Sequence, residues 1–349
     1  MYNTDLLSSP RSLEHALILG GSGFMGSALG RRLEQANGLT SYLVHARPLR
    51  RQNDRQRLHH GSLSRFDWRT LAGEKPDVIY HFARIPGKGR FGRLVAGLQS
   101  ARANSRLLQW LESQPQPPLL VLIAGTLSYG SHGHEWITED TPYRPTSFAR
   151  EYSLGEAPIV AAVRRQRIPV QIMRPSWVYG PESWFKSYYL KPMLQSGIIP
   201  RYGDGSAWMS LIHVEDTAAM IHYLSMYGAS GENYNLFIGE PWTQERFVQE
   251  LQQLTRLPVQ PVAAQELLRR YGRVVAEAFA FSLRVSTKHK ALYAGFQAKY
   301  PDHRQGLADL LSAPVLADRT AKPARPHSPA APATDLQANV ISRLMISGA

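Results

Sequence analysis

The chain has 349 residues, 43% of them hydrophobic, no cysteine and a formal net charge of +13 at pH 7. This length allows two domains, or one large α/β body with a smaller lobe. The lack of cysteine excludes disulfides and thiolate metal sites and fits a reducing compartment. Residues 1–14 lack a signal-peptide pattern, and no run approaches the ~20 apolar residues that span a bilayer. We therefore expect a cytoplasmic protein without a membrane partner.

The excess of basic residues suggests an anionic partner. These residues lie in separate groups near 47–57, 88–93 and 164–167, and they do not form one tract with interleaved aromatic residues. We therefore expect phosphorylated small molecules as partners, and no nucleic acid.

A short apolar run at residues 17–19 ends in three glycines, Gly20, Gly23 and Gly26, and a helical pattern follows. Gly20 allows a tight turn, Gly23 allows the backbone to approach a pyrophosphate, and Gly26 allows close packing of helix on strand. The pyrophosphate would then face free N–H groups at the start of the helix. The spacing predicts a dinucleotide-binding turn.

The end of the second predicted strand, residues 41–46, bears on the cofactor. NAD-specific sites place a carboxylate there for the ribose 2′-hydroxyl, whereas a 2′-phosphate calls for arginine. Here Arg47, Arg50 and Arg51 follow the strand, and no carboxylate does. The pattern favours NADP(H) over NAD(H), the alternative being that these arginines form a solvated loop.

Further buried runs at residues 77–83 and 119–124 predict strands, with a helical pattern at 91–111 between them. This alternation predicts an α/β fold with a Rossmann-type doubly wound parallel sheet. We assign residues 15–180 to the Rossmann domain. Residues 181–311 form a smaller C-terminal α/β substrate lobe, with some segments returning to the Rossmann body. Residues 1–14 are an N-terminal extension, and residues 312–349 are a Pro/Ala-rich linker and tail.

Five further segments strengthen the pattern set by residues 20–26; they are residues 78–83, 174–181, 202–206, 212–218 and 306–307. Their order and spacing over about residues 16–311 resemble the extended short-chain dehydrogenases/reductases, the NAD(P)-dependent epimerase/dehydratase group. The resemblance implies a nicotinamide cofactor. The residues expected to bind it are Gly20, Gly23, Phe24, Met25, Gly26, Arg47, Phe82, Ala83 and Arg174.

In that family, a hydroxyl before a Tyr-Gly pair holds the substrate oxygen, and a Tyr-x-x-x-Lys helix provides the acid/base. In this chain Gly125 stands at the hydroxyl position, and Thr126 is the nearest substitute. Aligning Glu156 with the family's glutamate puts Phe148 at the tyrosine and Tyr152 at the lysine. A shift of one turn gives Tyr152-x-x-x-Glu156 instead, in which a carboxylate would disfavour the phenolate.

Neither register contains the dyad, so three interpretations stay open. Tyr152 is a displaced acid/base assisted by a cation such as Arg150 or by the nicotinamide; the reaction needs no tyrosinate; or the site is inactive. A helix tyrosine packed at the domain interface is the structural alternative for Tyr152. We take Thr126 and Tyr152 as the candidate catalytic residues.

The substrate expectation comes from the second half of the chain. Sugar-nucleotide members commonly carry an arginine shortly after Gly-Asp-Gly-Ser, and Met209 stands there in this chain. With Trp177, Trp184 and Trp208, it suggests an apolar or aromatic ligand rather than an ordinary sugar nucleotide. Aromatic residues between Trp184 and Met193 lie on a helical pattern, which is more often core than pocket.

Two more helices are predicted at residues 243–254, capped by Thr243, and at residues 266–278. The proline-rich tail ends in a short helical pattern at 335–346, either disordered or docking on a partner or a second subunit, so a homodimer stays open. The sequence predicts an NADP(H)-dependent oxidoreductase, epimerase or dehydratase of a biosynthetic pathway, acting on an apolar or aromatic small-molecule carbonyl or alcohol. The alternative is a catalytically inactive cofactor-binding or assembly protein.

Overall fold

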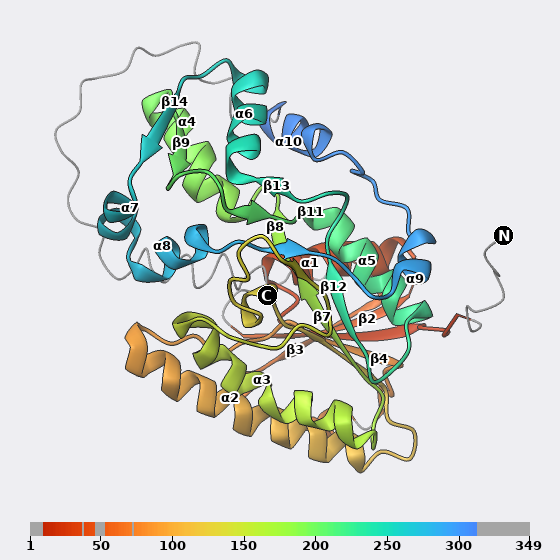
Figure 1. Ribbon diagram of the computed structural model, residues 1–349. Helices are drawn as coiled ribbons and strands as arrows, with labels where there is room; N and C mark the ends of the chain where they lie inside the picture. Colours follow the sequence, from red (N-terminus) through yellow and green to blue (C-terminus); the bar gives the residue numbers. More distant parts are fainter. Residues whose placement is uncertain (1–9, 37, 46–52, 72, 313–349) are drawn as a thin grey trace.

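A seven-stranded parallel sheet forms the centre of the protein (Figure 1). The computed structural model describes residues 10–36, 38–45, 53–71 and 73–312, apart from the side chains of residues 147 and 148. Across the sheet the strands run in the order β12 (Asn233–Leu236), β7 (Val170–Pro175), β5 (Leu119–Ile123), β4 (Val78–His81), β1 (His15–Leu19), β2 (Leu39–Val44) and β3 (Gln56–His60). The sheet pairs are parallel from β12 to β3.

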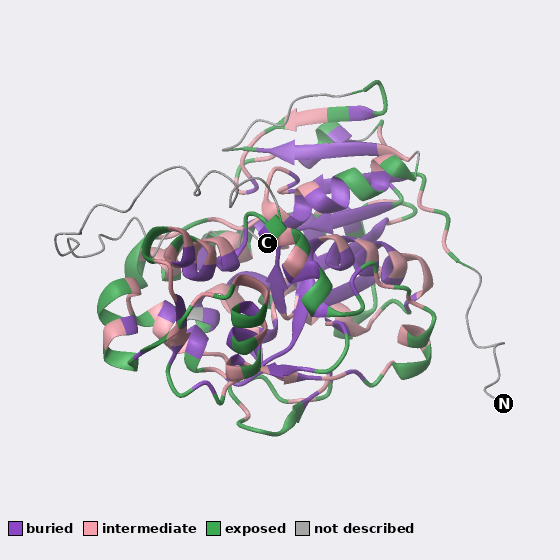
Figure 2. Ribbon diagram, turned by 90° about the horizontal axis from the view of Figure 1, so that it is seen from above, coloured by how far each residue is buried: buried purple, intermediate pink, exposed green. Residues whose placement is uncertain are grey.

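Helices cover both faces of this sheet. Alternate strand residues point to opposite sides, and the apolar residues on each side are buried against helices. In β1, Ala16 and Ile18 pack into a core with α1 (Phe24–Gln35) and α5 (Val214–Tyr227). Leu17 and Leu19 pack into another core with α2 (Gly89–Glu112) and α3 (Ser147–Arg165). Figure 2 shows the resulting buried sheet between exposed helix surfaces. The predicted Rossmann-type doubly wound fold is confirmed.

Helices α2 and α3 lie side by side on one face of the sheet (Figure 1). They approach each other closely at two glycines. A Cβ atom added to Gly97 of α2 would lie 2.3 Å from the carbonyl oxygen of Glu151 in α3. One added to Gly155 of α3 would lie 2.8 Å from Cβ of Ser100. These two glycines therefore bring α3 close to α2.

A second, smaller lobe lies beyond the carboxyl ends of the strands (Figure 1). Its elements are β8 (Trp177–Tyr179), η4 (Lys186–Leu190), α4 (Lys191–Ser196), β9 (Ile199–Tyr202), β10 (Trp208–Met209), β11 (Leu211–His213), β13 (Trp242–Thr243), α6 (Gln244–Thr255), β14 (Val259–Val262), α7 (Ala264–Tyr271), α8 (Arg273–Ala280) and α10 (His303–Ser312). Aromatic side chains dominate its core, with Trp184 and Phe247 at 5.7 Å between ring centroids and Phe279 at 4.5 Å from Tyr202.

Short elements complete the described chain: η2 (Trp68–Leu71), η3 (Thr126–Ser128), β6 (Trp136–Ile137), β15 (Arg284–Val285) and α9 (Lys290–Ala294). The pairing of β6 with β15 joins the loop after η3 to the segment that follows α8. This pairing places residues 130–146 against the smaller lobe.

Two details differ from the sequence prediction, and one agrees with it. Strands β3, β7 and β12 of the sheet were not predicted as strands, although β12 is a later segment that returns to the sheet, as was expected. The single helix expected at residues 266–278 is two, α7 and α8, because Gly272 breaks it at φ +80°. The predicted Thr243 cap is confirmed, since its hydroxyl accepts a bond from the Arg246 N–H at 3.2 Å.

None of the helices within the described ranges is long and apolar enough to cross a membrane. The predicted tail at residues 312–349 lies outside the described residues apart from Ser312, as do residues 1–9.

Candidate active site

The glycine turn joins β1 to α1 at the carboxyl edge of the sheet. Gly20 has φ +84°, a conformation that favours glycine, and a Cβ added to it would lie 3.0 Å from the Ala83 nitrogen. A Cβ on Gly26 would lie 2.6 Å from the Gly20 carbonyl oxygen. Gly20 and Gly26 therefore fill the backbone roles that their spacing predicted.

The start of α1 is open to an anion. Gly23 is its N-cap, its first turn has no acidic residue, and no side chain caps its N–H groups. Such N–H groups, at the positive end of the helix dipole, fit the pyrophosphate of a dinucleotide. Phe24 packs on Gly180, where an added Cβ would lie 3.0 Å from its ring, and Met25 is buried. Side-chain contacts of Phe24 and Met25 with a cofactor stay a prediction.

The end of β4 passes directly beneath this turn. Phe82 is buried, and the backbone of Ala83 lies so close to Gly20 that a Cβ at position 20 would be crowded. The preceding His81 is bonded through Nε2 to the Asn104 amide oxygen at 2.8 Å, and burial lowers the pKa of His81 to about 4. The neutral imidazole thus connects β4 to α2, and Asn104 in turn donates to the Gly155 carbonyl of α3 at 2.8 Å.

Arg47, the residue expected to select the cofactor, lies outside the described residues. The structure follows the strand to its end at Val44 and shows His45 exposed just beyond it. The preference for NADP(H) therefore stays a prediction from sequence.

Thr126 lies in η3 directly after β5, but its hydroxyl is turned inward. It is 2% exposed and donates to the Pro175 carbonyl at 3.4 Å. At Gly125, by contrast, an added Cβ would meet nothing within 4 Å. The open space therefore lies at the position where the family carries its hydroxyl, and the role of Thr126 toward a substrate stays a prediction.

Arg174 is a fully buried arginine on β7. Its Nη1 donates to the Gly125 carbonyl at 3.2 Å, and its Cζ lies 4.5 Å from the ring centroid of Tyr143. Burial opposes its charge, but Tyr143 and the Glu156 carboxylate, 3.9 Å away, outweigh this, so the pKa of Arg174 is raised. A direct contact of Arg174 with the cofactor stays a prediction.

Tyr152 lies on the second turn of α3, half-buried, with a cation over its ring. The cation is Arg84, whose Cζ lies 5.4 Å from the ring centroid. Arg84 also donates to Glu156 Oε1 at 3.2 Å. Arg150, the cation named from the sequence, is exposed. The structure thus brings Tyr152 and Glu156 together, as the helical spacing requires, and adds Arg84.

Sequence reasoning missed Arg84 and Tyr143. Arg84 directly follows the predicted strand at residues 77–83, so it stands at the carboxyl edge where ligands bind in such sheets. An arginine directly after a predicted strand could therefore have been identified from the sequence as a candidate site residue. Tyr143 lies in an irregular loop, and no local pattern connects it to Arg174, 31 positions further along the chain.

The residues that suggested an apolar ligand are mostly core. Trp177, Trp184 and Met209 are each at most 4% exposed and belong to the aromatic core of the smaller lobe. Trp208 is half-buried and donates through Nε1 to His134 Nδ1 at 2.8 Å. Three of the four side chains that suggested an apolar ligand therefore fill the interior of the smaller lobe, which needs large apolar side chains.

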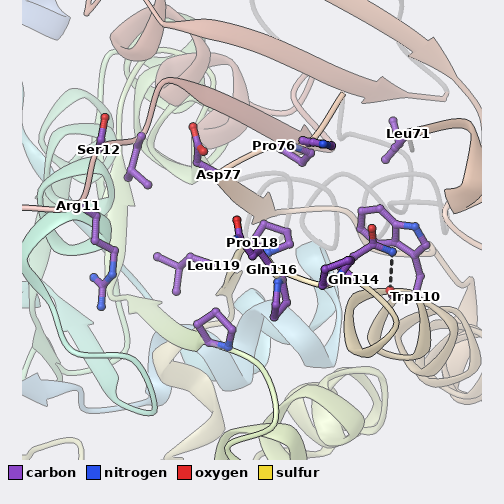
Figure 3. A pocket seen from close by; sticks show the side chains of 15 residues that line it. Arg11, Ser12, Leu71, Pro76, Asp77, Trp110, Gln114, Gln116, Pro118 and Leu119 are labelled. Atoms are coloured by element: carbon purple, nitrogen blue, oxygen red, sulfur yellow. Dashed lines mark hydrogen bonds between the residues drawn. The ribbon is translucent and has the colours of Figure 1, made fainter. Parts of the chain in front are cut away.

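A cavity of about 940 Å³ lies at the opposite, amino-terminal edge of the sheet (Figure 3). Its walls include Asp77 before β4, Leu119 at the start of β5, and Trp110 near the end of α2. The Gln114 amide that lines it donates to the Trp110 carbonyl at 3.0 Å. This cavity is separate from the glycine turn, because the strands run between the two edges. Within the described ranges, no group of three or more His, Asp or Glu side chains could hold a metal ion.

The sequence and the fold both match known proteins. The sequence model of the NAD dependent epimerase/dehydratase family matches residues 16–236. The dTDP-glucose 4,6-dehydratase of Neisseria gonorrhoeae is 26% identical over 64% of this chain and 72% of its own. The crystal structure of the Streptomyces venezuelae dTDP-glucose 4,6-dehydratase DesIV, with NAD and TYD bound, has a TM-score of 0.67 at 23% identity, covering 87% of this chain and 97% of its own.

A human protein of similar fold differs in cofactor. The epimerase family protein SDR39U1, isoform 2, with NADPH, has a TM-score of 0.65 at 19% identity, covering 86% of this chain and 99% of its own. Proteins of this fold thus include both NAD and NADPH complexes. With the family model matching residues 16–236, the chain belongs to the NAD-dependent epimerase/dehydratase family, among the extended short-chain dehydrogenases/reductases.

Proposed function

We propose that the protein is an active NAD(P)-dependent enzyme that oxidises or reduces a carbon bearing a hydroxyl or carbonyl group, either as a net reaction or as part of an epimerisation or dehydration. The observation that carries the proposal is the arrangement at one sheet edge. The glycine turn offers an uncapped helix start, and Tyr152 lies on the neighbouring α3 with a cation on its ring. A nicotinamide dinucleotide supplies hydride transfer in this family's chemistry.

The chain's own residues have three tasks in this proposal. The N–H groups at the start of α1 bind the pyrophosphate, and Gly20 and Gly26 keep the turn close enough for this. Tyr152 donates a proton to the substrate oxygen, or accepts one from it. The segment with Gly125 and Thr126 positions that oxygen, with the open space at Gly125 giving it room.

Sugar nucleotides are the first substrate class to examine, contrary to the sequence-based expectation. The relatives named above are dTDP-glucose dehydratases, and three of the four side chains that argued for an apolar ligand are core. Met209 still stands where an arginine is common, and its burial at 1% exposure excludes direct contact with a diphosphate from that side chain. We therefore propose a hydroxylated, anionic substrate whose diphosphate is held by other residues.

An assay panel tests this substrate proposal. The full-length protein would be incubated with NAD(P) and with dTDP-glucose, UDP-glucose or apolar aromatic ketones. Products would be followed by mass spectrometry and by nicotinamide absorbance, because a dehydratase that regenerates its cofactor gives no net absorbance change. Turnover of the aromatic ketones alone would contradict the proposal.

We also propose that NADP(H) binds more tightly than NAD(H), because Arg47 and its neighbours offer charge-assisted bonds to a 2′-phosphate. Replacing Arg47 by Asp should weaken NADPH by about 1.5–3 kcal/mol, the usual worth of hydrogen bonds to charged groups, and leave NADH little changed. Calorimetric titration of both cofactors measures this. Equal affinity of the unchanged protein for the two would refute the preference.

The alternative function is a cofactor-binding protein without catalysis, and the inward-turned Thr126 hydroxyl favours it. Tyr152→Phe separates the two. Loss of a general acid/base should lower turnover by ~10²–10⁴ while cofactor affinity stays the same. Thr126→Val, which keeps the shape, should cost less than Tyr152→Phe. Cofactor binding without turnover of any substrate in the panel would support the alternative.

A further inference from the structure

We infer that Arg84 supplies the positive charge that the lysine of the Tyr-x-x-x-Lys helix supplies elsewhere in the family. The acid/base pair of this protein is then Tyr152 of α3 with Arg84 from the loop after β4, assembled from two segments rather than one helix. The inference rests on the proposed role of Tyr152, and it names a positioning and charge-stabilising residue that the sequence pattern does not reveal.

Arg84 stands where the cofactor turn and α3 meet. It follows Phe82 and Ala83, and Ala83 lies under Gly20 with 3.0 Å between its nitrogen and a Cβ added to Gly20. From this strand end the side chain reaches across to α3, where it contacts Tyr152 and Glu156. A residue at this place lies next to both the cofactor turn and the catalytic helix.

The geometry suits a cation acting on a phenol. Arg84 Cζ lies 5.4 Å from the Tyr152 ring centroid, within the ~6 Å over which a guanidinium and an aromatic ring attract each other. The Arg84 side chain is 19% exposed, so solvent screens its charge only in part. A guanidinium stays protonated, so it favours negative charge on the phenol without exchanging a proton itself.

Glu156 lies one helical turn after Tyr152 in α3, and its negative charge does not cancel that of Arg84. Its carboxylate is shared between Arg84, at 3.2 Å, and the buried Arg174, at 3.9 Å. Two guanidinium groups around one carboxylate leave a net charge of about +1 on this cluster, whose Arg84 contacts Tyr152. The neighbouring pair of Arg93 and Glu151 is balanced and adds no net charge. Glu156 therefore orients Arg84, and the two guanidinium groups outweigh the opposing charge that the sequence suggested.

In the reducing direction, the Tyr152 O–H bond would break and its proton would go to the substrate oxygen, while the carbon would receive hydride from a bound reduced nicotinamide. Arg84 stabilises the phenolate left behind, which regains a proton from solvent. The oxidising direction reverses each transfer. Arg84 keeps its protons throughout, so the cation changes the energy of the phenolate and not the proton balance.

The test follows the ionisation of Tyr152 directly. The full-length protein would carry ¹³C at the hydroxyl-bearing ring carbon of tyrosine, and the Tyr152 signal would be the one absent from Tyr152→Phe. Arg84→Met, which keeps the length of the side chain and removes its charge, should raise the midpoint of that titration by about one pH unit, a tenfold change in proton affinity. Arg84→Lys should raise it by less. Glu156→Gln should shift it in the opposite direction.

Arg93→Met is the matched control, because the Arg93–Glu151 pair also binds an arginine to α3 with similar burial of its side chains, 17% and 10% exposed against 19% and 11% for Arg84 and Glu156. It should shift the Tyr152 midpoint by less than Arg84→Met does, and an equal shift in the two variants would contradict the inference. An unchanged midpoint in Arg84→Met, or in both Arg84→Lys and Glu156→Gln if Arg84→Met does not fold, would overturn the inference. Turnover of Tyr152→Phe tests the proposed function separately, and normal turnover in that variant refutes it. The titration midpoint is measured without substrate, so it tests the role of Arg84 on its own.

Discussion

The glycine turn and the Tyr152 site lie at the same edge of the sheet but are specified in different ways. The turn is made by residues 20–26, and its requirements concern backbone space and one positive φ. The Tyr152 site draws Arg84, Glu156 and Arg174 from three elements spread over 90 positions. The first can be recognised from a short pattern, whereas the second depends on side chains that only the folded sheet brings together.

The largest expected effect is a loss of folding stability in acid, because the fold buries neutral histidines. Burial lowers the pKa values of His81, His213, His222 and His303 to about 4, against 6.5 for an exposed histidine. The unfolded chain therefore binds more protons than the folded one between pH 6.5 and 4. Stability is full above about pH 6.5 and falls as the pH drops through this window, by about 1.4 kcal/mol per pKa unit for each histidine at most.

Urea unfolding at several pH values between 7 and 4 measures this loss. We expect several kcal/mol in sum, and a shallower decline in His222→Gln, which has one such group fewer. A stability that stays constant down to pH 4 would show that these imidazoles become protonated without cost in the folded protein. The glycine turn contributes no titrating group to this loss.

The next effect tests the turn itself. In Gly26→Val, the new Cβ would lie 2.6 Å from the Gly20 carbonyl and 3.0 Å from Gly21 Cα, both backbone atoms that cannot move aside cheaply. We expect cofactor affinity to fall by about 3 kcal/mol, roughly a hundredfold, because the strain is at the upper end of overpacking and opens the pyrophosphate cradle. Calorimetry with NADH and NADPH measures the loss, with circular dichroism to confirm folding. Unaltered binding would contradict the turn's assignment.

A smaller effect is expected where α3 packs on α2, on the side of the Tyr152 site. Gly97→Ala places a Cβ 2.3 Å from the Glu151 carbonyl and should destabilise the fold by about 1–3 kcal/mol. Gly92→Ala in the same helix is the control, because its nearest neighbour would be 3.6 Å away. It should be neutral or stabilising by at most about 1 kcal/mol. Equal thermal unfolding of the two variants would mean that α3 does not rest on Gly97.

The comparison also shows how far the sequence could go. The run at residues 17–19 and its three glycines predicted β1, the turn and α1, because strand, turn and helix each leave a local pattern. Strand β3, with His59 and His60 in a polar sequence, left no apolar run to find. Trp177 and Trp184 suggested an apolar ligand but are core residues, and the sequence could not decide this because a large aromatic side chain can line a cavity or fill a core. Arg84 was missed, because its partners Tyr152 and Glu156 are some 70 positions away.

The smallest expected effect compares the same bond in two regions. Thr146 caps α3 by accepting a bond from the Ala149 N–H at 3.0 Å, and Thr243 caps α6 by accepting one from the Arg246 N–H at 3.2 Å. Each Thr→Ala change should cost about 1 kcal/mol, the usual worth of an N-cap. Only Thr146→Ala loosens the first turn of the helix that carries Tyr152, whereas α6 lies in the smaller lobe (Figure 1). We therefore expect similar losses of unfolding free energy, with turnover reduced several-fold in Thr146→Ala and unchanged in Thr243→Ala. If both variants lose stability equally and neither loses turnover, the start of α3 has no part in positioning Tyr152, and other contacts, such as that with Arg84, hold it in place.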